Sequence, residues 1–423
     1  MTNLLRNVAA LIAALTILQL AGGLLGVRIP LAFTSGEHSR TELGLIAACY
    51  SAGYMMGAMI ATTLLSRVGH IRVYAACAAI FAAATLALYF SSDMWNWGVV
   101  RLVSGIVVAL MFAAIESWMN SSIGSASRGE VMSVYMVMTK AALAVGPFLA
   151  SNYAPSAPEP WMIAAGIAAV SMVPVCFTST AEPTPPKAQP LALVEQFATA
   201  PAAVIAAFGA GLTNAGVLAL APLYAAEHYG ANAAAEFYSA AFTGSLLLQW
   251  PAGRVSDRVD RRLVIAALAA IAAVSAFGLA LYSGHLARWA AVGLFFIWGA
   301  GALSFYGIAV AHMADRATHG RLAQSAAGIL FVWAAGSVAG PILQGPLVDL
   351  FGVAGMFWFA GAAAVLVVAG MFWRKTTREE AHTKEEFAPQ IGTSVAAGEI
   401  AYGEDTNPSG GLASGAAPPK TAS

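Results

Sequence analysis

The sequence predicts an all-α integral membrane protein with twelve transmembrane helices in two pseudo-symmetric six-helix bundles. Three observations predict this fold: an apolar composition, twelve apolar segments of membrane-spanning length, and a repeat that relates the two halves of the chain. Of 423 residues, 59% are hydrophobic and 10% are charged, whereas a soluble domain carries about 25% charged residues. A single water-soluble core cannot bury this much apolar surface, so lipid must be the solvent for much of it.

Each predicted span is long enough to cross the membrane, because a helix needs about 20 residues to cross roughly 30 Å of hydrocarbon. The twelve spans are 8–33, 42–65, 71–91, 96–120, 130–153, 160–178, 201–226, 236–255, 262–283, 288–312, 322–346 and 352–373. The first segment is longer than the apolar region of a signal peptide, and similar segments follow it. We therefore interpret it as a helix that stays in the mature protein.

Positive charge is distributed unevenly among the loops that connect these spans. Short cytoplasmic loops of membrane proteins carry an excess of Lys and Arg. With a cytoplasmic N-terminus, the outer loops hold Arg40 and Arg288, and the basic residues on the cytoplasmic side are Arg6, Arg67, Arg72, Arg128, Lys187, Arg254, Arg258, Arg261, Arg262, Arg316, Arg321, Arg374, Lys375 and Arg378. We therefore expect a multi-pass protein of the bacterial cell inner membrane with both termini in the cytoplasm.

Composition divides the chain into two bundles, a linker and a tail. We predict an N-terminal six-helix bundle over 1–178, a cytoplasmic linker over 179–200 and a C-terminal six-helix bundle over 201–375. The linker contains Pro183, Pro185 and Pro186, and proline at this density cannot sustain a helix. Residues 376–423 are rich in Gly, Ala, Pro and Ser, which predicts a disordered cytoplasmic tail.

Several features of the first half recur in the second half after a nearly constant interval. The recurring pairs are Ser66–His70 with Asp257–Arg261, 191 residues later, Gly146-Pro147 with Gly340-Pro341, 194 residues later, Gly53 with Gly244, and Pro30 with Pro222. Independent pairs at nearly one offset indicate duplication of a six-helix unit. Two parallel repeats around an axis along the membrane normal are one established organisation of transporters.

The segment Gly253–Arg262 reads G-R-V-S-D-R-V-D-R-R. It resembles the loop signature G-x-L-x-D-R-x-G-R-R of the major facilitator superfamily (MFS), with Asp260 at the position of the second glycine. The first-half copy around Arg67 and Gly69 is weaker, because Ser66 replaces the acidic residue. Segment Arg101–Gly105 is similar to the fourth-helix motif R-x-x-Q/S-G of this family. The resemblance covers roughly residues 8–373 and implies the MFS fold.

Further combinations are similar to the YcaD-like subgroup of facilitators. They are Gln249–Arg254 (Q-W-P-A-G-R), Glu116-Ser117, and Arg128-Gly129 ahead of Tyr135-Met136. This subgroup implies a transporter without an assigned substrate, so the resemblance informs the fold more than the cargo.

The loop signature suggests a cytoplasmic gate. Asp257 at the end of a helix can accept hydrogen bonds from the N-terminal amides of a neighbouring helix, where the dipole favours an anion. Arg258 can hold that acid or a second carboxylate in place. The alternative is that these charges only fix the topology. The candidate gate residues are Arg67, Gly69, Glu116, Arg128, Gly253, Asp257 and Arg258.

Ionisable residues inside the spans are candidates for a central cavity, because burying one costs at least about 2.5–3.5 kcal/mol. Lys140 lies near the bilayer midplane, and its alternative is a buried structural pair. Arg101 and Arg28 lie nearer the outer surface, where each can instead extend its charged end to the membrane surface. The candidate cavity residues are Arg28, Arg101, Lys140, Tyr135, Asn214 and Trp333.

Glu116 follows Arg101 by fifteen residues, which separates the two by about 22 Å along a helix. The two side chains therefore cannot pair, and Glu116 falls within reach of Arg67 or Arg128. We interpret Glu116 as a gate or packing residue, with a proton-carrying carboxylate as the alternative.

These patterns favour a secondary active transporter that moves a small organic solute by alternating access, coupled to protons. Three cations and one displaced acid in the N-terminal half indicate an anionic cargo. The alternatives are proton-coupled efflux of hydrophobic compounds and a membrane sensor that has lost transport. We expect a monomer in the lipid bilayer that binds a small-molecule substrate and protons. Because no catalytic, metal-ligand or phosphate-binding pattern is present, we expect no enzyme activity, cofactor, metal or nucleic acid.

Overall fold

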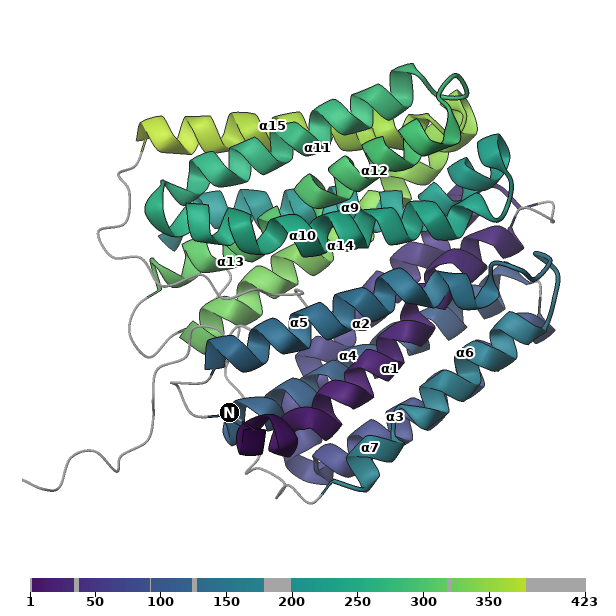
Figure 1. The fold of residues 1–423 in the computed structure, drawn as a ribbon, viewed down its shortest axis with the longest axis vertical. Helices are drawn as coiled ribbons and strands as arrows, with labels where there is room; N and C mark the ends of the chain where they lie inside the picture. Colours follow the sequence, from purple (N-terminus) through teal and green to yellow (C-terminus); the bar gives the residue numbers. More distant parts are fainter. Residues whose placement is uncertain are drawn as a thin grey trace, which may run out of the picture.

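The computed structural model describes residues 2–33, 38–91, 93–123, 128–178, 199–317 and 322–377, and every regular element in these ranges is a helix (Figure 1). The first half contains α1 (Thr2–Ala32), α2 (Arg40–Val68), α3 (His70–Phe90), α4 (Met94–Ser122), α5 (Arg128–Val145), the 3-10 helix η2 (Gly146–Ala150), α6 (Glu159–Val170) and α7 (Val173–Cys176). The second half contains α9 (Pro201–Tyr229), α10 (Ala233–Arg258), α11 (Arg261–Leu281), α12 (Arg288–Ala302), α13 (Phe305–Ala314), α14 (Leu322–Phe351) and α15 (Gly355–Thr377).

The helices confirm the predicted spans. Three crossings are interrupted: α5 continues as η2, α6 continues as α7, and α12 continues as α13. Within the described residues, eleven segments are long and apolar enough to cross a membrane. The twelfth crossing is α10, which is as long as its neighbours but contains Glu236, Arg254, Asp257 and Arg258. Glu236 lies in the first turn of α10 and the other three near its end, so these charges lie toward the two membrane surfaces.

At Gly146-Pro147 the fifth crossing changes from an α-helix to a 3-10 helix. Proline removes the backbone N–H that an α-helix needs at this position. The equivalent step at Gly340-Pro341 behaves differently, since α14 remains helical through Pro341. The linker prediction over 179–200 and the tail prediction over 376–423 fall largely outside the described residues.

Large apolar side chains cover the outside of the molecule, as a lipid solvent requires. Phe90, Trp95, Trp289 and Leu366 are each at least 70% exposed. Trp95 and Trp289 lie at the beginning of α4 and α12, where tryptophan is enriched at membrane–water interfaces. The protein therefore has apolar side chains both in its core and on its surface.

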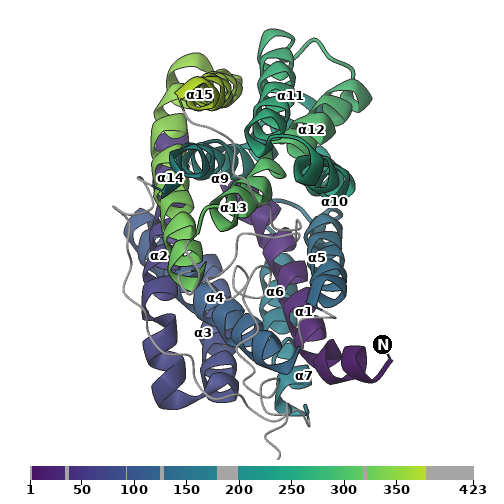
Figure 2. The same ribbon diagram turned by 90° about the vertical axis from the view of Figure 1, so that its left-hand side faces the viewer.

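The two halves form separate lobes that lie side by side, and helices of both halves line the boundary between them (Figure 2). The lobes meet through α2 with α14, α5 with α10, and α1 with α9 and α10. We call the face at which α1 begins and α15 ends the N-terminal face, and the opposite face the far face. The alternating direction of the helices places the start of α2 and the end of α14 on the far face.

Close helix contacts repeat the sequence duplication in space. A Cβ on Gly53 of α2 would lie 2.0 Å from the Leu102 carbonyl oxygen of α4. A Cβ on Gly244 of α10 would lie 2.2 Å from the Phe296 carbonyl oxygen of α12. The α2–α4 contact of the first half therefore corresponds to the α10–α12 contact of the second half. Small residues permit this approach where two backbones touch.

A second pair of contacts follows the same relation. Gly146 faces the Leu20 carbonyl oxygen of α1, and Gly340 faces the Leu212 carbonyl oxygen of α9. A Cβ at either glycine would lie 2.3 or 2.4 Å from that oxygen. The two bundles are therefore pseudo-symmetric in their internal packing as well as in sequence.

A carboxylate joins the halves at the far face. Asp349, near the end of α14, accepts hydrogen bonds from the backbone N–H of Arg40 at 2.9 Å and of Thr41 at 2.8 Å. The Thr41 hydroxyl donates a third bond at 2.5 Å. These are the first N–H groups of α2, where the helix dipole favours an anion. We call this contact, between Asp349 and Arg40-Thr41, the far-face latch.

We predict that Gly105→Ala destabilises the protein. A Cβ on Gly105 would lie 2.1 Å from the Tyr50 carbonyl oxygen, so α4 and α2 must separate to admit it. Overpacking of this kind costs about 1–3 kcal/mol. The thermal unfolding temperature of the detergent-purified protein should fall.

Gly166→Ala is the matched control, because a Cβ on this helical glycine meets nothing within 4 Å. Its unfolding temperature should be unchanged or higher, since alanine favours a helix over glycine. Equal loss of stability in both variants would contradict the packing explanation.

Candidate functional site

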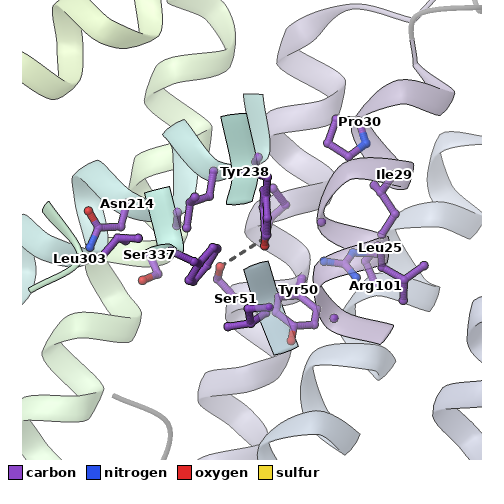
Figure 3. A pocket seen from close by; sticks show the side chains of 18 of the residues that line it. Leu25, Ile29, Pro30, Tyr50, Ser51, Arg101, Asn214, Tyr238, Leu303 and Ser337 are labelled. Atoms are coloured by element: carbon purple, nitrogen blue, oxygen red, sulfur yellow. Dashed lines mark hydrogen bonds between the residues drawn. The ribbon is translucent and has the colours of Figure 1, made fainter. Parts of the chain in front are cut away.

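A cavity of about 340 Å³ lies between the two halves (Figure 3). Its walls come from α1, α2, α3, α4 and α5 of the first half and from α9, α10, α13 and α14 of the second half. Apolar residues such as Leu25, Ile29 and Phe242 alternate there with polar ones. Its polar and aromatic lining residues include Gln19, Tyr50, Ser51, Arg101, Lys140, Asn214, Tyr238, Tyr306, Trp333 and Ser337.

A second cavity of about 240 Å³ shares part of this lining, including Tyr50, Ser51 and Trp333. It is also lined by Val108 and Phe112, which follow Arg101 along α4 in the direction of the N-terminal face. The hollow space therefore extends from the centre toward the N-terminal face, while the latch joins the halves at the far face.

Lys140 connects the two halves inside the cavity wall. Its side chain is 4% exposed. The ammonium group donates hydrogen bonds to the Ser245 hydroxyl at 2.5 Å and to the amide oxygen of Gln249, both on α10. These acceptors are neutral, and among the described residues no carboxylate forms an ion pair with Lys140. Its positive charge is therefore solvated by dipoles and left without a counter-charge.

Arg101 lies in the wall between α4 and α2. Its guanidinium carbon is 4.1 Å from the centre of the Tyr50 ring, a cation–π contact. Its Nε is buried without a hydrogen-bond partner. No described carboxylate pairs with this guanidinium. Arg101 and Lys140 are thus two cations in one cavity.

Asn214 and Trp333 also line the cavity, from the second half. The Asn214 amide donates to the Ala302 carbonyl oxygen at 3.0 Å, which joins α9 to the end of α12. The Trp333 ring lies 6.3 Å from Tyr54 and 5.7 Å from Tyr306. Because Tyr54 belongs to α2, this aromatic contact crosses between the halves.

The other two cavity candidates lie elsewhere. Arg28, which is 3% exposed, donates to the backbone carbonyls of Ala154 and Ala157 and lies over Trp161. It fastens α1 to the loop before α6 and is not among the cavity-lining residues. Tyr135 is buried and donates to a Glu116 carboxylate oxygen at 2.5 Å. This bond joins α5 to α4 within the first half.

Several lining residues did not stand out in the sequence. Tyr50, Ser51, Tyr238 and Ser337 are common residue types inside apolar helices, and only the packing shows that they face the cavity. For Tyr238 the sequence contained one indication, the glycine at position 26. Gly26 provides the space for the Tyr238 hydroxyl group, because a Cβ on Gly26 would lie 2.4 Å from that oxygen. A glycine inside a span thus indicated a close neighbour, but not which one.

The first-half gate candidates are spread over one end of the molecule. Gly69 separates α2 from α3 with φ of 93°, a conformation that favours glycine. Arg67 is exposed and Glu116 is buried. Arg128 begins α5, and the position of its side chain is outside the described structure. The assignment of these residues to a gate therefore stays a prediction.

The second-half loop forms a buried ion-pair cluster around Arg261. This side chain, 1% exposed, donates to both carboxylate oxygens of Asp315 at 2.7 and 3.1 Å. It also donates to Asp257 at 3.1 Å and to the Ser256 hydroxyl at 2.9 Å. We call Asp257, Arg261 and Asp315 the loop cluster.

The loop cluster changes one expectation. We expected Arg258 to hold the acid, but Arg258 is exposed, and Arg261 makes the contact with Asp257 instead. The reason is the turn at Val259-Asp260 between α10 and α11, which brings Arg261 at the start of α11 back beside Asp257 at the end of α10. Gly253 is buried within α10, and its carbonyl oxygen accepts from Ser256 at 2.7 Å.

Asp260, which departs from the family signature, has a structural role of its own. Its side chain accepts from the Arg262 backbone N–H at 2.9 Å and caps α11. Its φ of −52° needs no glycine. Burial alone would raise the pKa of this carboxyl, but the hydrogen bonds from Arg262 hold the pKa below its ordinary value. The stability that ionised Asp260 contributes is therefore present at neutral pH and lost only as the pH falls through the lowered pKa.

In the parts of the chain that the structure describes, no group of three or more His, Cys, Asp or Glu side chains is arranged to hold a metal ion. The polar groups of the cavity can bind and release a solute through hydrogen bonds and charge.

We predict that Asp315→Asn strongly destabilises the protein, because it leaves the buried Arg261 without its principal counter-charge. Removing one partner of a buried ion pair costs about 3–5 kcal/mol. Glu236→Gln is the matched control. The Arg288–Glu236 pair has a similar length of 2.6 Å, but its side chains are 41% and 40% exposed, and such pairs contribute at most about 1 kcal/mol. Similar unfolding temperatures for the two variants would contradict the importance of the loop cluster.

Known proteins resemble this chain in both sequence and fold. The YcaD protein of Escherichia coli strain S88, described as an uncharacterized MFS-type transporter, is 25% identical over 356 residues, which cover 83% of this chain and 91% of that protein. A mutant of the nucleoside transporter NupG superposes with a TM-score of 0.74 at 12% identity, covering 87% of this chain and 100% of NupG. The human organic anion transporter MFSD10 superposes with a TM-score of 0.61 at 14% identity, covering 87% and 99%.

The fucose:proton symporter FucP of E. coli superposes with a TM-score of 0.58 at 14% identity, covering 88% of this chain and 99% of FucP. The family model of the Major Facilitator Superfamily matches residues 11–334 and, in a second match, residues 203–406. Two pseudo-symmetric bundles with a cavity between them, a loop that carries the family signature and a family match along most of the chain lead to one conclusion. This protein belongs to the Major Facilitator Superfamily.

Proposed function

We propose that the protein is a secondary active transporter that moves a small organic solute across the membrane by alternating access, coupled to protons. The observation that carries this proposal is the cavity between two pseudo-symmetric halves, because it is lined by both halves and contains two cations, Arg101 and Lys140. Its volume of about 340 Å³ suits a small organic molecule. The structural neighbours NupG, FucP and MFSD10 are transporters of a nucleoside, fucose and organic anions.

The orientation that we propose places the N-terminal face in the cytoplasm of a bacterial inner membrane. Exposed basic residues at this face support it, because cytoplasmic loops carry an excess of positive charge. Those of the described residues are Arg67, Arg72, Arg254, Arg258 and Lys375. In this orientation the cavity extends toward the cytoplasm. We propose that the monomer is the transporting unit, since the cavity is complete within one chain.

Alternating access requires contacts between the halves that form on one face and break on the other. The far-face latch suits this role, because Asp349 of the second half caps the first turn of α2 of the first half. We propose that the latch closes the pathway to the outside while the cavity extends to the cytoplasm. When the latch opens, the two N–H groups can bond to water at the membrane surface, so its opening is not prohibitively costly.

Lys140 is the residue that we propose for proton coupling. Its ammonium group donates to Ser245 and Gln249 across the halves. Loss of its proton removes the charge that strengthens these bonds, which loosens α5 from α10. Binding or release of one proton at Lys140 would thereby change the free energy of the interface that must rearrange during transport.

Efflux of hydrophobic compounds remains the alternative that shares this fold. The apolar lining at Leu25, Ile29 and Phe242 fits it, whereas the two cations of the cavity do not favour hydrophobic cations. A non-transporting sensor is separated from both by the labelling of a cysteine at Ser51, predicted below.

We predict that a cysteine at Ser51 is reachable from both faces of the membrane. Ser51 lines both cavities. Cys49, Cys77 and Cys176 are first replaced by alanine. Membrane-impermeant maleimide should label the introduced cysteine in right-side-out and in inside-out vesicles, because the pathway opens alternately. Labelling from one face alone would contradict alternating access and favour a sensor.

Asp349→Ala in this background should raise the labelling rate from the far face. The loss of hydrogen bonds to a charged acceptor, each worth about 1.5–3 kcal/mol, shifts the protein toward the state that is open there. Asp93→Ala is the matched control, since Asp93 caps α4 at the same face but within one half. An equal effect of the two variants would contradict a latch function of Asp349.

We predict that Lys140→Gln abolishes proton-driven accumulation. Proteoliposomes with an alkaline interior are supplied with radiolabelled uridine, L-fucose and phenylacetate, and uptake is compared with that of protein-free liposomes. Uptake of a transported probe should fall about tenfold or more, because losing a charge-assisted hydrogen bond is worth about 1.5–3 kcal/mol. Lys375→Gln, at the exposed end of α15, should transport normally. Accumulation that survives a protonophore would contradict proton coupling.

A further inference from the structure

We infer that the solute bound in the central cavity is a small organic anion, held at its charged end by Arg101 and at its apolar end by aromatic and aliphatic side chains. This inference rests on the proposed transport function and narrows its substrate class. It follows from the charge balance of the lining, from the unused hydrogen-bonding capacity of Arg101, and from the position of the apolar wall.

The charge balance of the cavity is uniformly positive. Arg101 and Lys140 are its charged lining residues, and no aspartate or glutamate is among the described residues that line it. Clefts that carry one sign of charge between low-dielectric walls concentrate ions of the opposite sign. The buried acid Glu116 of α4 accepts a hydrogen bond from Tyr135 within the first bundle and does not line this cavity. An anion would therefore supply the counter-charge that the protein itself does not provide.

The two cations differ in how far their hydrogen-bond donors are already used within the protein. Lys140 already donates to Ser245 and Gln249 of α10. Arg101 is stacked on Tyr50, its Nε is buried without a hydrogen-bond partner, and no described side chain forms an ion pair with it. A guanidinium group offers donors in a planar fork that matches a carboxylate. Arg101 is therefore the anion-binding residue, and Lys140 adds a second positive charge to the same cavity.

Two tyrosines complete the polar end of the site. The Tyr50 ring is in cation–π contact with Arg101, and Figure 3 shows Tyr50 and Tyr238 beside it at the boundary between the halves. A phenol hydroxyl can donate to an anionic oxygen. Tyr238 belongs to the second half and reaches the first half over Gly26. An anion held by Arg101 and Tyr238 together would thus bind both halves.

The rest of the wall selects an apolar body of moderate size. The cavity is also lined by Leu25, Ile29, Leu218, Phe242 and Trp333, and burial of apolar solute surface against them is favourable. The matching solute has one anionic group and an aromatic or branched aliphatic body. This assignment disfavours solutes whose only ionised group is a cation, because the two positive charges repel it.

The test measures the charge preference of the cavity directly and needs no identified solute. The variant Ser51→Cys, with the native cysteines replaced by alanine, is purified in detergent and treated with two thiosulfonate reagents of similar size. One carries a sulfonate and the other a trimethylammonium group. Each modification rate is divided by the rate of that reagent with free 2-mercaptoethanol, so that intrinsic reactivity cancels.

We expect the normalised rate of the anionic reagent to exceed that of the cationic reagent by about tenfold or more, as a cavity of one charge sign produces. Arg101→Gln should remove most of this preference, whereas Arg101→Lys, which keeps the charge, should retain much of it. Arg72→Gln is the matched control, since Arg72 is exposed on α3 and lies outside the cavity. If Arg101→Gln does not fold, the preference for the anionic reagent in the protein that keeps Arg101, together with the result for Arg101→Lys, still decides the question.

A normalised ratio near one, or a preference for the cation, would overturn the anion assignment and leave the transport proposal intact. A preference that persists unchanged in Arg101→Gln would overturn the role of Arg101. If neither reagent reaches the cysteine, the cavity does not open to water, and both the anion assignment and the proposed transport cycle are wrong.

Discussion

A charged side chain inside the hydrocarbon layer must find a counter-charge, hydrogen bonds or water, and this constraint organises the protein. Arg28 meets it with two backbone carbonyls of a loop, and Glu116 meets it with a tyrosine hydroxyl. Lys140 meets it with neutral acceptors across the two halves, and Arg101 with an aromatic ring. The first two solutions are closed and strengthen one bundle. The last two leave positive charge at a cavity wall, where a ligand can neutralise it.

The contacts within each half and the contacts between the halves are of different kinds. Within a half, glycines such as Gly53 and Gly244 bring backbones together along whole helices, and such packing does not slide without creating voids or clashes. Between the halves, polar contacts at Lys140 and Asp349 contribute beside apolar packing, and these contacts can be replaced by water. This difference suits two bundles that move as units about a central site. It also explains why the proposed cycle depends on only a few ionisable groups.

The loop that carries the family signature contributes to this rigidity. Arg261 joins Asp257 at the end of α10 to Asp315 after α13, and Asp260 caps α11. Three helix ends of the second half, those of α10, α11 and α13, are thereby fixed at the N-terminal face. The basic residues in this loop have unequal roles, because Arg261 is buried in the cluster and Arg258 is exposed. Two residues of one motif thus need not be equally buried. The direction in which each side chain points decides whether it is buried or exposed.

The sequence by itself determined the membrane solvent, the spans and the duplication, because these depend on composition, segment length and residue spacing. It also indicated that Arg101, Lys140, Asn214 and Trp333 are unusual, since a polar group in a span is costly wherever the helix points. Only the tertiary structure decided which of these groups share a cavity, because that depends on helix rotation and on neighbours more than a hundred residues away. Arg28 and Tyr135 illustrate the limit. Their positions in the spans resemble those of the cavity residues, but their helices direct them toward partners within one bundle.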